Sequence, residues 1–155
     1  MNSAERYSGV YIYVFEIVEG APVRVGALGQ INLGRGFHAY VGSAKRAIAK
    51  RLKRHRRKRK PMRWHIDYLA RVARPVCAVT WAWREGRECR LAAAIDSLEL
   101  GELAAKSFGA SDCACPGHLF RLNVSDPRIL RDDLSAEIGE AGAVESYEKP
   151  AAASR

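Results

Sequence analysis

The sequence predicts an α+β fold, in which a small mixed or antiparallel β-sheet is flanked by about three helices. Short segments rich in β-branched and aromatic residues come first, and helical spacing of apolar residues begins only after them. A chain of 155 residues is long enough for one core and short for two domains. We therefore expect a single domain over residues 7–124. Large apolar residues are few after it, so residues 125–155 are predicted to form a mostly disordered tail.

Three strands are predicted before the first helix, and glycine-containing turns separate them. They cover Gly9–Val18, Val23–Leu28 and Phe37–Val41. Tight turns between successive strands favour an antiparallel meander.

Helical spacing begins after the third strand. Ser43 stands at the expected N-cap of a helix over Ala44–Lys58, in which Ile48 and Leu52 lie four positions apart and form a narrow apolar stripe. The later elements expected are a helix over Trp64–Ala73, a strand over Val76–Trp83, a helix over Arg87–Ser107 and a strand over Leu119–Val124.

Positive charge is concentrated in residues 45–63. This segment holds 12 of the 26 Lys and Arg residues and no acid, which leaves 14 cations against 17 acids elsewhere. Cations without interspersed acids repel one another unless a polyanion neutralises them, so we expect nucleic acid as the partner. The side chains expected to contact phosphate are Lys45, Arg46, Lys50, Lys53, Arg54, Arg56, Arg57, Lys58, Arg59, Lys60 and Arg63.

The sequence contains no signal for a membrane or an export route. No apolar run approaches the roughly 18 residues that a membrane-spanning helix needs, and the N-terminus has no apolar segment typical of a secretory signal. We therefore expect a cytoplasmic protein with no membrane partner, whose four cysteines are reduced thiols.

Several motifs occur in a fixed order along the chain. Gly9-Val10-Tyr11 and Tyr40-Val41-Gly42 each lie on a predicted strand, a basic helix with Arg51 and His55 follows, and Glu88 opens a later helix. In this order they resemble the GIY-YIG nuclease superfamily. The resemblance implies a fold of the kind predicted above and a metal-dependent endonuclease that hydrolyses phosphodiester bonds in DNA, which is expected as the partner before RNA. Because no helix carries Asn, Gln and Arg in a base-reading arrangement, we expect binding that is selective for structure and not for sequence.

Three further segments resemble an uncharacterised subfamily of that superfamily. They are Trp64–Leu69 (WHIDYL), the pair Glu88-Cys89, and Ser111–Phe120, so the resemblance covers about residues 9–122. The chain departs from the better-studied nucleases in two respects. Its two tripeptides are further apart, which implies an inserted strand, and Asn123 is the only candidate for a late Asn of the active site.

The resemblance implies roles for five residues. Tyr11 or Tyr40 would orient or deprotonate the attacking water, Arg51 would bind the scissile phosphate, and His55 would assist as acid or base. Glu88 would bind Mg²⁺ or Mn²⁺ through its carboxylate. Taken singly, these residues also fit structural roles: strand tyrosines with half-buried rings, a solvated basic face, and a first-turn carboxylate stabilised by the helix dipole.

A second metal set is suggested by Cys113, Cys115 and His118, with Cys89 or His65 as a fourth zinc ligand. One residue between the two cysteines is tighter than the two to four usual in structural zinc sites, so we favour buried or helix-packing thiols. His65 is expected to pack beside Trp64. Two other functions stay open: a noncatalytic nucleic-acid-binding module of the same fold, and a zinc-stabilised adaptor that binds RNA.

Overall fold

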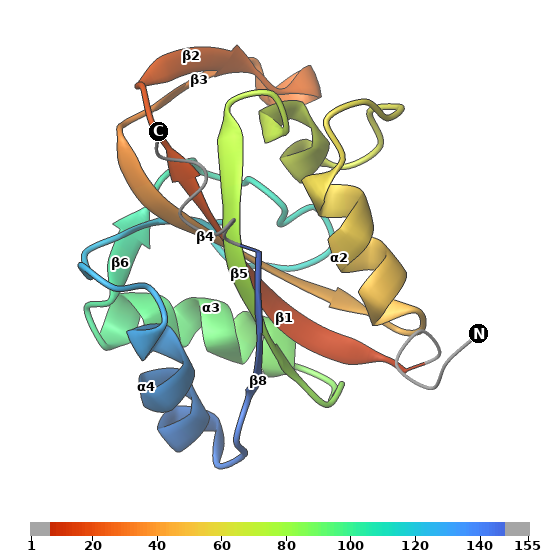
Figure 1. Ribbon diagram of the computed structural model, residues 1–155, viewed down its shortest axis with the longest axis vertical. Helices are drawn as coiled ribbons and strands as arrows, with labels where there is room; N and C mark the ends of the chain where they lie inside the picture. Colours follow the sequence, from red (N-terminus) through yellow and green to blue (C-terminus); the bar gives the residue numbers. More distant parts are fainter. Residues whose placement is uncertain (1–6, 148–155) are drawn as a thin grey trace.

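Two long antiparallel strands form the centre of the fold, which a computed structural model describes over residues 7–147 (Figure 1). They are β1 (Gly9–Ile17) and β4 (Gly36–Ala44). Their register places Tyr11 opposite Gly42 and Tyr13 opposite Tyr40. Both strands are rich in β-branched and aromatic residues, which pack well on a pleated surface, and both are almost entirely buried.

Four more strands extend this pair into a six-stranded antiparallel sheet of order β6-β7-β4-β1-β5-β8. They are β5 (Ala73–Trp81), β6 (Gly101–Leu103), β7 (Leu119–Leu122) and β8 (Ala143–Ser146). The α+β prediction, with an antiparallel sheet and three helices, is confirmed.

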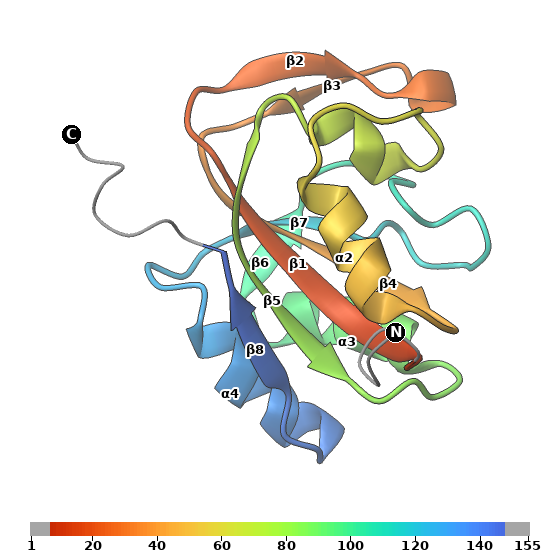
Figure 2. The same ribbon diagram turned by 45° about the vertical axis from the view of Figure 1, so that its right-hand side comes forward.

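The predicted three-strand meander is wrong. The segment between β1 and β4 leaves the main sheet and pairs with itself as β2 (Ala21–Arg24) and β3 (Gln30–Leu33), a separate hairpin at the top of Figure 2. A 3₁₀ turn over Gly26–Leu28 replaces the second half of the predicted strand. Its two flanking glycines, Gly26 and Gly29, have φ of 46° and 77°, values that a strand does not contain.

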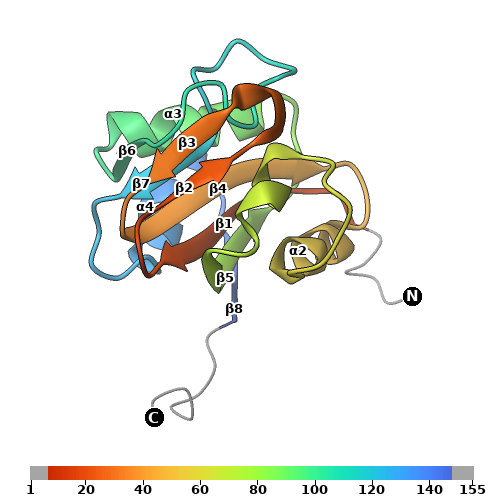
Figure 3. The ribbon, with the colours of Figure 1, turned by 90° about the horizontal axis from the view of Figure 1, so that it is seen from above.

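Helices cover both faces of the sheet (Figure 3). On one face lie α2 (Ile48–Arg56) and a 3₁₀ turn over His65–Leu69, packed on Tyr11 and Tyr13. On the other face lie α3 (Arg87–Ser97) and α4 (Ile129–Ile138), packed on alternate residues of the same strands. The period of two along β1 therefore sends its aromatic side chains to the α2 face and its aliphatic ones to the α3 face.

Three of the predicted helix boundaries are wrong. Ser43 lies within β4 and not at an N-cap, because the helix is capped four residues later at Ala47, whose φ is 56°. The segment predicted as a helix over 64–73 is only the short 3₁₀ turn, and β5 begins at Ala73. The helix predicted to reach residue 107 ends at Ser97, because Glu99 adopts φ of 56° and the chain then enters β6.

The prediction of a disordered tail after residue 124 is also wrong for the residues that the structure describes. Leu130, Leu134 and Ile138 are spaced by four on α4 and are buried against the sheet. β8 then pairs with β5 beside α4 (Figure 2). The rest of the predicted tail, residues 148–155, lies outside the described part. Within residues 7–147, no helix is both long enough and apolar enough to cross a bilayer.

Candidate active site and metal cluster

A cleft of about 240 Å³ opens where β1, β4, α2 and the start of α3 meet. Four residues singled out from the sequence line it together: Tyr11, Tyr40, Arg51 and Glu88. The other lining residues are Gly42, Ser43, Arg63, Trp64, His65, Gly109, Ser111 and Asp112. Residues far apart in the sequence thus converge on one polar site.

The two tripeptides are connected physically by the cross-strand pair of Tyr11 and Gly42. A Cβ on Gly42 would lie 2.5 Å from the Tyr11 hydroxyl oxygen and 2.6 Å from the adjoining ring carbon. Only glycine leaves room for the Tyr11 ring to lie across β4. The glycine of the second motif therefore positions the tyrosine of the first.

His55 lies behind Tyr11 and does not line the cleft. The Tyr11 hydroxyl oxygen is 2.7 Å from Nε2 of His55. The other ring nitrogen of His55, Nδ1, is buried and has no hydrogen-bond partner in the described chain. Burial raises the pKa values of Tyr11 and Tyr40 well above the ordinary tyrosine value.

Arg51 is held at the cleft by a hydrogen bond and a ring contact. Its Nη1 donates to the carbonyl oxygen of Ser43 at 3.0 Å, and its guanidinium carbon lies 4.3 Å from the centre of the Trp64 ring. Neither partner is a carboxylate, and among residues 7–147 no acid lies within ion-pair distance of Arg51. The guanidinium thus faces the cleft without a direct ion pair, although its charge helps to lower the pKa of Glu88, after the hydrogen bonds from His118 and Ser43.

Glu88 lies in the first turn of α3, and both of its oxygens accept hydrogen bonds. Oε1 accepts from the Ser43 hydroxyl at 2.5 Å, and Oε2 accepts from Nδ1 of His118 at 2.8 Å. Burial alone would raise the pKa of Glu88, but the hydrogen bonds from His118 and Ser43 lower it below its ordinary value. The same contacts act on His118: burial alone would lower its pKa, but the hydrogen bonds to Glu88 and Cys115 raise it to about 9.

The oxygen donors around Glu88 suit a hard divalent cation. The Glu88 carboxylate is ionised and 28% exposed, and the Tyr11 and Tyr40 side chains line the same cleft. Asp112 adds a second carboxylate to the lining. Mg²⁺ is commonly bound through one or two carboxylates together with water and phosphate oxygens, so these residues fit Mg²⁺ or Mn²⁺.

Next to Glu88 lies a cluster of softer donors. The ligand atoms of Cys89, Cys113, Cys115 and His118 all lie within 4.8 Å of one another and could hold a metal ion. Thiolate and imidazole donors fit zinc better than magnesium. None of these three cysteines is buried, contrary to the expectation of buried thiols, and Cys89 lies on α3. Cys77 is the buried core thiol.

His65 is not part of this cluster. Its Nδ1 accepts a hydrogen bond from the Gly109 amide at 2.8 Å, and its ring packs against Phe108. The contacts of His65 are thus with Gly109 and Phe108, and the prediction that it packs beside Trp64 stays a prediction. Asn123, the sequence candidate for a late active-site Asn, does not line the cleft; its amide donates to the Glu99 carbonyl oxygen at 3.4 Å.

Most of the predicted phosphate-binding side chains are on the surface. The exposed ones are Lys45, Arg46, Lys50, Lys53, Arg56, Arg57, Lys58, Arg59 and Arg63. The prediction is wrong for Arg54 and Lys60, which bind inside the protein. Arg54 donates to Oδ2 of Asp67 at 2.8 Å, and Lys60 donates to the carbonyl oxygens of Arg54 and His55 at 2.7 and 3.1 Å. Lys60 thus adds a donor to the carbonyls at the C-terminal end of α2, where the Arg54 oxygen also accepts from the Arg57 amide.

Sequence reasoning missed several members of the site. Ser43 was assigned to a helix cap, although its hydroxyl binds Glu88. The cleft is also lined by Trp64, Gly109 and Asp112. Trp64 lies in the WHIDYL segment and Asp112 in the segment Ser111–Phe120, and membership of these segments was the only sign in the sequence that the two residues have a role.

A comparison with protein families identifies the chain. The model of DUF123, described as a domain of unknown function, matches residues 10–139. The chain belongs to this family. The DUF123 match covers the cleft, the Cys/His cluster and all of α4, in agreement with the corrected extent of the domain. No curated protein and no solved structure matches this DUF123 chain.

Because His55 is buried, we predict that acid lowers the stability of this DUF123 domain. Burial, followed by the charges of Lys60 and Arg51, lowers the pKa of His55 to about 3. Above pH ~6.5 the imidazole is neutral in both folded and unfolded chains and contributes nothing. Below it, only the unfolded chain takes up the proton, so the free energy of unfolding falls by about 1.4 kcal/mol per pH unit until about pH 3.

Urea denaturation of wild type and His55→Gln between pH 4 and 8 measures this effect. Gln keeps a polar group near the Tyr11 hydroxyl and has no proton to gain. The difference in unfolding free energy should be constant above pH ~6.5 and shift by about 1.4 kcal/mol per unit below it. If the unfolding free energies of wild type and His55→Gln change in parallel from pH 4 to 8, the lowered pKa of His55 is wrong.

Proposed function

We propose that the protein is a metal-dependent endonuclease of the GIY-YIG type that cleaves DNA. The observation that carries the proposal is the convergence of Tyr11, Tyr40, Arg51 and Glu88 on one cleft. Individually, each of these residues fits a structural role. Two neutral phenols, a cation without an acid partner and an ionised carboxylate in one polar cleft instead supply the groups that phosphodiester hydrolysis needs.

The proton pathway runs from water to Tyr11 and on to His55. A water in the cleft gives a proton to the Tyr11 oxygen while the Tyr11 hydroxyl gives its own to Nε2 of His55, 2.7 Å away. The water oxygen attacks phosphorus, the bond to the leaving sugar oxygen breaks, and the alkoxide that leaves takes a proton from water. Burial keeps His55 neutral but lowers its basicity, and the negative charge of a bound phosphate offsets this by favouring the imidazolium that forms.

Arg51 stabilises the charge that develops on the phosphate. The Ser43 carbonyl and the Trp64 ring hold its guanidinium in one orientation, so little reorganisation is needed during the reaction. Glu88 would hold Mg²⁺ or Mn²⁺, and the bound ion supplies Lewis-acid stabilisation of phosphate and leaving-group oxygens. The hydrogen bonds from Ser43 and His118 fix the Glu88 carboxylate for this purpose.

The basic segment is the proposed docking surface for the phosphate backbone. Arg63 lines the catalytic cleft, and the exposed cations of α2 and the following loop continue from it. A second, larger cavity of about 710 Å³ is lined by Arg24, Lys58, Arg59 and Arg71. Contacts of this kind bind the backbone and read no bases, so selectivity for DNA structure is expected over selectivity for sequence.

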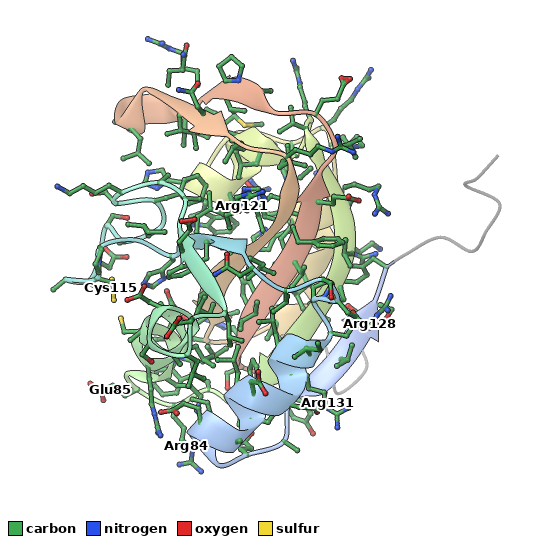
Figure 4. The ribbon with its side chains drawn as sticks, turned by 90° about the vertical axis from the view of Figure 1, so that its left-hand side faces the viewer. Arg84, Glu85, Cys115, Arg121, Arg128 and Arg131 are labelled. Carbon is green, nitrogen blue, oxygen red and sulfur yellow. The ribbon has the colours of Figure 1, made fainter. Side chains whose placement is uncertain are left out.

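Incubation with labelled single-stranded, duplex and branched DNA, in Mg²⁺, Mn²⁺ or EDTA, tests the proposal. We expect cleavage with either metal and none in EDTA. Glu88→Gln and Arg51→Ala should lose cleavage, and both should still bind DNA because the exposed cations remain. Glu102→Gln and Arg131→Ala are matched controls: both residues are exposed, and Arg131 lies on α4 (Figure 4).

Binding without cleavage on every DNA and RNA substrate would overturn the nuclease and leave a noncatalytic nucleic-acid-binding module. Cleavage that survives in Glu88→Gln would show that the activity belongs to another site or to a contaminant.

A further inference from the structure

We propose that Cys89, Cys113, Cys115 and His118 bind one structural zinc ion, and that the zinc positions Glu88 through His118. The four ligands come from two segments, one helix and one loop. Cys89 lies in the first turn of α3, Cys113 and Cys115 lie on the loop between β6 and β7, and His118 immediately precedes β7. Figure 4 shows Cys115 at the surface beside α3. A zinc ion here would connect that loop to the helix that carries Glu88.

The dimensions of the cluster fit tetrahedral zinc. With Zn–S of about 2.3 Å and Zn–N of about 2.0 Å, sulfur atoms lie about 3.8 Å apart and sulfur lies about 3.5 Å from nitrogen. Sγ of Cys113 is 3.5 Å from Nε2 of His118, and all four ligand atoms lie within 4.8 Å of one another. Side-chain movements of about 1 Å therefore suffice to close four bonds on one ion. Three thiols and one imidazole form the Cys₃His donor set of structural zinc sites.

The loop itself favours a cross-link at this point. Residues 104–118 contain no helix or strand, and few backbone hydrogen bonds hold them, among them Ser107 N to Pro116 O and His118 N to Phe108 O. Gly117 allows the turn between Cys115 and His118 to approach the chain closely, since a Cβ there would lie 2.7 Å from the Ala105 carbonyl oxygen. The turn thus brings its ligands onto α3 without an apolar core of its own.

The two ring nitrogens of His118 connect this cluster to the catalytic cleft. Nε2 faces Cys113, whereas Nδ1 faces Oε2 of Glu88 at 2.8 Å and the Val41 carbonyl oxygen at 3.2 Å. Zinc on Nε2 requires the proton to be on Nδ1, where it is donated to the carboxylate. This carboxylate–histidine–zinc arrangement fixes the orientation of both groups. His118 is therefore a zinc ligand and a positioning residue for Glu88, a role that rests on the proposed function of Glu88.

Metal analysis of the full chain tests the zinc site without any nuclease assay. Protein purified under reducing conditions without added metal should contain one zinc per chain. X-ray absorption at the zinc edge should show sulfur at about 2.3 Å and nitrogen at about 2.0 Å in a ratio of three to one. The double variant Cys113→Ser/Cys115→Ser should lose the zinc, and Cys77→Ala, which removes a thiol of the core, should keep it. Zinc-free wild type that takes up neither zinc nor Co²⁺ would overturn the site, as would a disulfide within the cluster or a shell of oxygen and nitrogen alone.

His118→Cys separates zinc binding from the positioning of Glu88. The variant still offers four zinc ligands, but Glu88 loses its Nδ1–H donor. We expect zinc content and thermal midpoint to stay at the wild-type values, while Mn²⁺ affinity, measured by electron paramagnetic resonance, falls about 10–100-fold. Ser97→Ala, which lies on α3 like Glu88, is the control and should leave Mn²⁺ affinity unchanged. Equal Mn²⁺ affinity in His118→Cys and wild type would overturn the positioning role and leave the zinc site intact. Wild type that binds zinc but no Mn²⁺ would overturn both that role and the proposed catalytic metal.

Discussion

Tyr11→Phe should reduce the rate of DNA cleavage by about 10²–10⁴-fold, the usual contribution of a positioned acid or base. Phe preserves the ring that packs opposite Gly42 and removes only the hydroxyl that joins the cleft to His55. Since no basic surface residue is changed, the affinity for DNA should stay within about twofold of wild type. Single-turnover cleavage and a binding titration in Ca²⁺ or EDTA measure the two quantities separately.

Tyr13→Phe is the matched control. Tyr13 lies two residues further along the same face of β1, is equally buried, and its ring centre is 5.4 Å from that of His55, but it does not line the cleft. Loss of the Tyr13 hydroxyl should change the rate of DNA cleavage by less than about threefold. If Tyr13→Phe and Tyr11→Phe are slowed equally, the effect comes from altered packing around His55 and the proton pathway is wrong.

The pathway also predicts that Tyr11 and His55 act as a unit. After Tyr11→Phe has removed the hydroxyl, His55 has no proton to accept, so adding His55→Gln should reduce the rate of cleavage little further. Additive losses in the double variant would mean that the two side chains contribute independently.

The strands of the central sheet could be predicted because their sequences differ strongly from the rest of the chain. β1 is an almost continuous run of aromatic and β-branched residues, and both β1 and β4 are buried on both faces. The end of the domain gave a weaker signal. α4 has only three buried apolar side chains, and β8, whose residues are all exposed, joins the sheet through backbone pairing with β5. The average composition after residue 124 does not reveal the regular spacing of the apolar residues on α4. It also cannot predict β8, because that strand has no apolar face.

The site shows the same division between what is local and what is not. The order of the motifs along the chain was enough to select four residues of the cleft: Tyr11, Tyr40, Arg51 and Glu88. Pairings across the fold, such as that of Ser43 with Glu88, have no spacing signal, because they depend on how β4 and α3 pack. The basic run was uniform in sequence, yet Arg54 and Lys60 bind a buried carboxylate and helix carbonyls. Charge counts do not distinguish those cations from their exposed neighbours.

Asp67→Ala should lower the free energy of unfolding by about 3–5 kcal/mol, the usual cost of removing one member of a buried ion pair. Oδ2 of Asp67 accepts from Arg54 at 2.8 Å and from the backbone N–H groups of Arg63 and Trp64 at 2.9 Å each. Nζ of Lys60 lies 3.7 Å from the other oxygen, and neither the Lys60 nor the Asp67 side chain is exposed. Alanine would leave the Arg54 guanidinium and two N–H groups without this acceptor, and the buried Lys60 ammonium without its nearby counter-charge. Urea denaturation at pH 7 measures the loss.

Asp133→Ala, at an exposed position of α4, is the control for this loss and should change the free energy of unfolding by less than about 0.5 kcal/mol.

Burial alone would raise the pKa of Asp67, but the hydrogen bonds from Trp64, Arg63 and Arg54 lower it below its ordinary value. The stability that Asp67 contributes is therefore present above the unfolded pKa, about 3.9, and is lost as pH falls through the folded value. A difference between wild type and Asp67→Ala that stays constant down to pH 2 would contradict this assignment.

The same substitution should slow cleavage, although Asp67 does not line the catalytic cleft. Asp67 fixes the start of the WHIDYL turn through the Trp64 amide, and the Trp64 ring in turn supports the Arg51 guanidinium. Trp64→Ala should therefore reproduce the catalytic part of the Asp67 effect with a smaller loss of stability, because it leaves the buried carboxylate and its cations in place. If Trp64→Ala cleaves at the wild-type rate while Asp67→Ala does not, the loss in Asp67→Ala comes from unfolding and not from a displaced Arg51.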